Sequence, residues 1–104
     1  FDAQARHFPY TLDMMERHPE GSQAFIPLSG VPMLVSVAKD NSGKPGLPRA
    51  FLSKPHQSIN IHRNTWHGVL APVERAGQYI VIDRIGDTPN LEEYYFQDSY
   101  IVNV

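Results

Sequence analysis

The sequence has 104 residues, about the usual size of one domain, so we predict a single domain, residues 1–104, with one hydrophobic core. Its 9 basic and 11 acidic residues give a formal net charge of −2, and no block of lysine or arginine indicates binding to nucleic acid or to an anionic membrane. There are no cysteines, which excludes disulfides, zinc–thiolate sites and cysteine nucleophiles. Any metal ligand must therefore come from histidine, carboxylate or amide side chains.

The sequence carries no membrane or secretion signal that we recognise. No apolar run approaches the roughly 20 residues that span a bilayer, and the first residues lack the basic-then-apolar layout of a signal peptide. We therefore expect a soluble, cytoplasmic protein. The chain starts at Phe1 and enters a periodic pattern almost at once, which suggests that further residues precede it in the natural protein.

Short segments rich in valine, isoleucine, tyrosine and phenylalanine predict a β protein, because the 9 prolines and 7 glycines divide the chain too often for long helices. In the first segment, residues 8–18, strict alternation places Leu12 and Met14 on the apolar face together with Glu16 and His18. Further strands are predicted for residues 23–28, 32–38, 49–52, 58–62, 66–70 and 78–83, with weaker candidates at 93–96 and 100–104.

Two of the later segments carry specific expectations. Residues 39–48 bring asparagine, serine, glycine and proline close together and predict a surface loop. Residues 78–83 are apolar at nearly every position, which indicates a strand covered on both faces, as in a sandwich or a closed barrel. Asp83 and Arg84, at the end of this strand, are expected to be structural and to pair with each other or with nearby loop charges.

The polar residues of the first segment raise the question of a site. Glu16 and His18 would present a carboxylate and an imidazole to a largely apolar interior, where burying them without partners is costly. They need a bound ion, water or other polar side chains, and a structural ion pair at a strand end is the alternative interpretation. Gln23 follows the next turn, and its amide oxygen could reach the same space. The stretch 60–69 adds His62, Arg63, Asn64 and His67.

The spacing of Glu16, His18, Gln23 and Gly30 resembles the first cupin motif, and His67 then resembles the histidine of the second motif. More closely, three stretches resemble the ureidoglycolate lyase family, also called ureidoglycolate hydrolase, of allantoin breakdown in purine metabolism. They are MERHPEGSQAFIPLSG (15–30), HRNTWHGVL (62–70) and IVIDR (80–84), with weaker support from NLEEYYF (90–96).

This resemblance implies an all-β, cupin-type double-stranded β-helix, or jelly-roll, barrel. It also implies a homodimer that cleaves ureidoglycolate to glyoxylate and urea. Members of the family begin well upstream of Phe1, so the barrel is expected to lack N-terminal strands in this chain.

The resemblance also implies a metal site for a divalent ion, nickel in the family, with Glu16, His18, Gln23 and His67 as ligands. Two of these depart from a typical metal-binding cupin, because Glu16 stands in place of a histidine and Gln23 in place of a glutamate. Amides are weak ligands, so the set is less favourable for a metal. The ion would polarise the substrate as a Lewis acid; without it, His67 or Glu16 would serve as the base. The catalytic residues implied are His67, Glu16 and His18.

Other residues are candidates for substrate binding. Arg63 or Arg17 could hold the substrate carboxylate, because a guanidinium offers two parallel donors, although alternation points Arg17 away from the interior. His62 or Asn64 could bind the ureido end, and Gln23 could also contact substrate. The alternative interpretations are a solvated strand end for Arg63, a tight turn for Asn64 and a core position for His67.

Two other functions remain open at the level of the sequence. A cupin fold could serve as a non-catalytic domain that binds a small carboxylate such as glyoxylate, because fold alone does not determine function. A metal-dependent oxygenase on the same scaffold is a weaker alternative, since a second histidine of the first motif is replaced.

Overall fold

The computed structural model describes residues 1–103, in which all regular secondary structure is β-strand. The strands are β1 (Asp2–Ala3), β2 (Tyr10–Arg17), β3 (Gln23–Pro27), β4 (Met33–Ala38), β5 (Asp40–Asn41), β6 (Lys44–Pro45), β7 (Arg49–Leu52), β8 (Ile59–Ile61), β9 (Trp66–His67), β10 (Ala71–Pro72), β11 (Gly77–Ile82) and β12 (Glu92–Val102). Across these residues there is no helix of the length and apolarity that crossing a membrane requires. The all-β prediction is confirmed.

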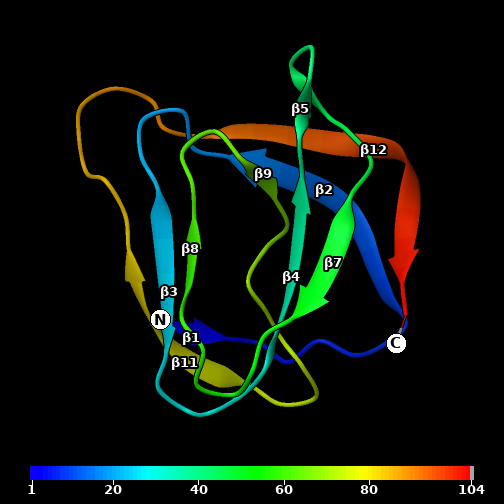
Figure 1. Cartoon of the computed structure of the whole chain (residues 1–104), viewed down its shortest axis with the longest axis vertical. Helices are drawn as coiled ribbons and strands as arrows, with labels where there is room; N and C mark the ends of the chain where they lie inside the picture. Colours follow the sequence, from blue (N-terminus) through cyan, green and yellow to red (C-terminus); the bar gives the residue numbers. More distant parts are fainter. Residues whose placement is uncertain (104) are drawn as a thin grey trace.

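The strands form two main antiparallel sheets. One has four strands in the order β1-β11-β3-β8, and the other has six, in the order β10-β4-β9-β2-β12 with β7 added beside β4. Figure 1 shows β3 and β8 together on one side of the molecule, β4 and β7 on the other, and β2 and β12 across one end. In the part of the chain described, the ladders leave both sheets open and do not close into a continuously bonded barrel.

Two clusters of buried apolar side chains stabilise the sheets. Met33 and Tyr79 are buried in the first cluster, where side chains of the two sheets meet, and Phe25 packs against them. The second cluster contains Met15 and Trp66 and is covered by aromatic residues of β12. Each large apolar side chain contributes about 1.5–3 kcal/mol when it is fully buried, so both clusters stabilise the arrangement of the strands.

The strict alternation expected along β2 is wrong in one respect. Leu12 and Met15 are three positions apart, yet they pack in the same buried cluster. The change occurs where the register between β2 and β12 shifts, between the pairs Tyr95↔Met14 and Tyr100↔Leu12. Glu16 and His18 do share a face, as predicted, but it is the face opposite to Leu12.

Other differences concern short or interrupted elements. The predicted loop 39–48 contains a small hairpin, β5 paired with β6. The two weak candidates at 93–96 and 100–104 are parts of the single long strand β12, except that residue 104 lies outside the described residues. The segment 66–70 is a strand only over β9, and the two-residue strands β1 and β10 were not predicted because such short pairings leave no periodic pattern.

A candidate metal and substrate site between the sheets

The site is organised by the pairing of β2 with β9. Glu16 and His67 are direct partners in this antiparallel pair, so their side chains point to the same face. Glu16 Oε1 lies 3.7 Å from His67 Nε2 and 4.0 Å from His18 Nε2. The structure therefore brings these three predicted residues together, although they come from two separate segments of the sequence.

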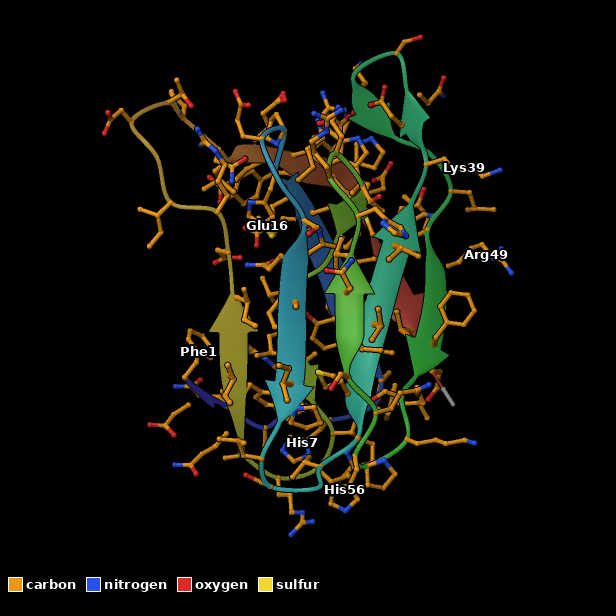
Figure 2. The ribbon with its side chains drawn as sticks, turned by 60° about the vertical axis from the view of Figure 1, so that its left-hand side comes forward. Phe1, His7, Glu16, Lys39, Arg49 and His56 are labelled. Carbon is orange, nitrogen blue, oxygen red and sulfur yellow. The ribbon has the colours of Figure 1, made fainter. Side chains whose placement is uncertain are left out.

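Glu16 and His67 border a cavity of about 400 Å³ that lies between strands of the two sheets. Its polar lining includes Glu16, Gln23, His67 and Asp83, and its apolar walls include Phe25 and Val81. Figure 2 shows Glu16 in the upper half of the molecule, at the end remote from His7 and His56. A small polar molecule could enter this space and contact charged and apolar groups at once.

Both histidines have a fixed orientation. The Nδ1–H of His67 donates to the carbonyl oxygen of Thr65 at 3.0 Å, and that of His18 donates to the carbonyl oxygen of Asn90 at 2.8 Å. A carbonyl can only accept, so the proton of each neutral ring is on Nδ1 and the lone pair is on Nε2. Metal-binding histidines are commonly held by this kind of second hydrogen bond.

The donor set fits a metal ion. One ligand atom from each of Glu16, His18 and His67 lies within 4.8 Å of the others, so the three residues could hold an ion. The Nε2 atom of His67 is buried and has no hydrogen-bond partner within residues 1–103. Gln23 Oε1 lies 3.2 Å from His18 Nε2, and with the amide in this orientation two acceptors face each other. A shared cation would satisfy them all.

Burial shifts the pKa values of two site residues, His67 and Glu16. It lowers the pKa of His67 from the ordinary value of 6.5, and the nearby His18 lowers it further, while the hydrogen bond to Thr65 and the charge of Asp83 act in the opposite direction. Burial raises the pKa of Glu16 above its ordinary value of 4.5, against the effect of His18. At neutral pH the imidazole of His67 is therefore neutral and can accept a proton or bind a cation.

This burial predicts the titration of His67 in metal-free protein. We expect its midpoint below pH 6.5 when the ring is followed by NMR, with the same residue in urea-unfolded protein as the comparison. The neutral ring contributes stability above pH 6.5, and this contribution is lost as the pH falls from 6.5 through the folded-state pKa, because the unfolded chain takes up the proton first. A folded-state midpoint at or above the unfolded one would contradict the burial of the ring.

The opposite face of the same strands is occupied by a second polar cluster. The guanidinium of Arg17 donates to Asp40 at 2.8 Å and to Glu92 at 3.1 Å, and its central carbon lies 4.5 Å from the centre of the Trp66 ring. The Nε1–H of Trp66 donates to the same Asp40 carboxylate at 3.0 Å. Arg17 therefore links β2, β5, β9 and β12 behind the site and does not point into the cavity, in agreement with its predicted direction.

The structure does not bring the other proposed substrate-binding residues into the cavity. His62, Arg63 and Asn64 are exposed in the turn between β8 and β9. Asn64 has a φ of 67°, and its backbone N–H donates to the carbonyl oxygen of His18 at 2.9 Å. This geometry supports the interpretation of Asn64 as a turn residue.

Asp83 was not recognised as a site residue from the sequence, although alternation along β11 could have indicated it. The expectation that this strand is covered on both faces is wrong, because Ile80 and Ile82 are 46% and 55% exposed. Tyr79 and Val81 point inward, and the next inward position is Asp83. The carbonyl groups of Thr65 and Asn90, which orient the histidines, carry no sequence signal because every residue has one.

Comparison with known proteins places these residues in a family. The profile of the ureidoglycolate lyase family matches residues 1–103. A ureidoglycolate lyase of Rhodobacter capsulatus is 62% identical over 94 residues, which cover 90% of this chain and 58% of that protein. The ureidoglycolate lyases of Chelativorans sp. and Rhizobium leguminosarum bv. trifolii are 50% and 49% identical over 97% and 98% of this chain, and 61% of each relative is covered.

The chain thus spans about three-fifths of the length of the curated relatives it matches. The match extends over almost every residue and includes the strands that carry Glu16, Gln23 and His67. The family resemblance found in the sequence is confirmed, and the chain belongs to the ureidoglycolate lyase family.

Proposed function

We propose that the full-length protein cleaves ureidoglycolate to glyoxylate and urea. The observation that carries this proposal is the state of His67, whose buried Nε2 has a fixed lone pair, no partner within residues 1–103 and a carboxylate, Glu16, 3.7 Å away in a cavity. Membership of the family supports the choice of substrate.

The reaction requires one proton to move from oxygen to nitrogen. The hydroxyl of the central carbon loses its proton and becomes the carbonyl of glyoxylate, while the bond from that carbon to the ureido nitrogen breaks. The nitrogen takes the proton and leaves as urea. When no ion is bound, Nε2 of neutral His67 accepts the hydroxyl proton and returns it to the nitrogen, and Gln23 can donate an amide N–H to the substrate.

Glu16, His18 and His67 would hold a divalent metal, with Gln23 as a fourth ligand. Imidazole and carboxylate ligands suit first-row divalent metals, and the family resemblance favours nickel. A bound ion supplies a Lewis acid that polarises oxygen atoms of the substrate. The protein contributes the fixed histidine orientations and the apolar wall that includes Phe25 and Val81.

Product analysis tests the proposed function. Full-length protein is incubated with racemic ureidoglycolate, before and after chelation, and urea, ammonia and glyoxylate are quantified against spontaneous decay. We expect enzyme-dependent urea and glyoxylate, a lower rate after chelation, and recovery when nickel is added back. Ammonia in place of urea, or no product above background in nickel-loaded protein, contradicts the proposal. Saturable binding of glyoxylate without turnover would instead identify a non-catalytic binding domain.

One observation favours a second candidate. Two histidines and one carboxylate, here His18, His67 and Glu16, are also the ligand set of many non-haem iron oxygenases. Oxygen consumption by the iron-loaded protein, measured with ureidoglycolate and with glyoxylate, distinguishes this candidate from the lyase, which needs no oxygen.

The homodimer, implied by the family resemblance, and the cytoplasmic location, expected from the sequence, are also proposals. An exposed apolar strip on the outer face of the four-stranded sheet, with Ile80 and Ile82, is compatible with an interface. Sedimentation of the full-length protein and cell fractionation test these two proposals.

A further inference from the structure

A second carboxylate, that of Asp83, lines the same cavity as Glu16, and the reaction described above gives it no role. It is carried by the opposite wall, at the end of β11, whereas Glu16 and His67 are carried by β2 and β9. A substrate lying in the cavity would therefore have the reacting groups on one side and Asp83 on the other.

The register of β11 explains how Asp83 reaches the cavity. β11 pairs with β3 from Tyr79↔Pro27 to Ile82↔Ala24, and one further step of the same register places Asp83 beside Gln23. Side chains alternate along a strand, so Asp83 follows Val81 on the inward face. Both residues border the cavity, which makes the position of Asp83 a consequence of the strand pairing.

The carboxylate of Asp83 is available to accept hydrogen bonds. Within residues 1–103 it has no hydrogen-bond or ion-pair partner. The expected pair with Arg84 does not form, and Arg84 donates to Thr88 at 3.1 Å. The negative charge of Asp83 reaches the reacting groups: it adds to the burial that raises the pKa of Glu16, and it opposes the burial that lowers the pKa of His67.

We propose that Asp83 binds the ureido end of the substrate and thereby selects the leaving group, an inference that rests on the proposed function. A ureido group presents N–H donors on both of its nitrogens, and an ionised carboxylate, which only accepts, can take two of them in parallel. Glyoxylate has no N–H group and gains nothing from Asp83. The carboxylate and hydroxyl of the substrate then lie toward Glu16, His18 and His67.

The test compares two ligands in full-length protein carrying Asp83→Asn. N-carbamoylglycine has the ureido end and the carboxylate but no hydroxyl, so it binds without being cleaved; glyoxylate has no ureido end. We expect the Kd of N-carbamoylglycine, measured by calorimetry, and the KM of ureidoglycolate each to rise about tenfold. The Kd of glyoxylate should stay unchanged or fall. Asp87→Asn, at an exposed position in the loop after β11, is the matched control and should change the Kd of neither ligand.

Each outcome decides the role of Asp83. Weaker binding of N-carbamoylglycine alone supports the proposal. Equally weaker binding of both ligands would mean that Asp83 acts through the structure or the overall electrostatic field of the site, and would overturn the proposal. Unchanged binding of N-carbamoylglycine overturns it as well. Failure of the proposed function is recognised separately, because the wild-type protein would then bind these ligands but form no urea and glyoxylate from ureidoglycolate.

Discussion

Replacement of His67 by alanine is expected to lower kcat/KM for ureidoglycolate by about 10²–10⁴-fold in the full-length protein, the usual range for loss of an acid–base group. The imidazole is buried, and its Nε2 faces Glu16 and has no hydrogen-bond partner among the described residues 1–103. The fold should survive, since the loss of packing around the ring is partly offset by removal of an unpaired buried nitrogen. Steady-state kinetics, with circular dichroism as the measure of folding, provide the test.

Two variants make this result interpretable. His67→Gln preserves much of the side-chain volume and a hydrogen-bonding oxygen, but it removes the imidazole, so it should lose activity as well. His7→Ala is the control, because His7 is exposed at the end of the molecule remote from Glu16 (Figure 2) and should leave activity unchanged. Unimpaired turnover by folded His67→Ala protein would remove His67 from the mechanism.

Trp66→Ala is expected to lower the free energy of unfolding by about 3–5 kcal/mol, the usual cost of truncating a fully buried tryptophan. Trp66 is only 2% exposed and packs with Leu12, Met15 and Ala38. Domains of this size are stable by about 5–15 kcal/mol in total, so the loss is large. Urea denaturation followed by circular dichroism measures the change.

Trp66→Phe is the matched variant. It keeps an aromatic ring in the cluster but loses the N–H bond to Asp40 and weakens the contact with Arg17, so the loss of stability should be smaller. Phe51→Ala, at a side chain that is 48% exposed, serves as the control for truncating an aromatic residue. A loss of stability below about 1 kcal/mol for Trp66→Ala would show that the cluster collapses into the space left by the indole and does not depend on it.

The part of the site that could be predicted from the sequence is the part encoded locally. Glu16 and His18 share a face because they are two positions apart where β2 ends, His18 directly following the strand, and Gln23 follows after a single turn. His67 was located through a motif. Alternation along β11 could have placed Asp83 on the inward face, but its position beside Gln23 depends on the pairing of β11 with β3, a contact between distant segments that a single sequence does not display.

The arginines illustrate the same limit. Arg17 and Arg63 were equal candidates for binding a carboxylate, because a guanidinium offers two parallel donors. Arg17 instead binds Asp40 and Glu92 on the opposite face, and Arg63 is exposed in a turn. The acidic partners of Arg17 lie 23 and 75 positions away, so the sequence neighbours of Arg17 gave no sign of its structural role.

The shortness of β9 has a consequence for folding. Its two residues send Trp66 to the buried aromatic cluster and His67 to the cavity, on opposite faces of the same sheet. A slip of one position would exchange them, leaving the imidazole in an apolar core and filling the cavity with an indole. The alternative register would therefore be both less stable and inactive. The packing of Trp66 and the placement of His67 thus favour the same register of β9.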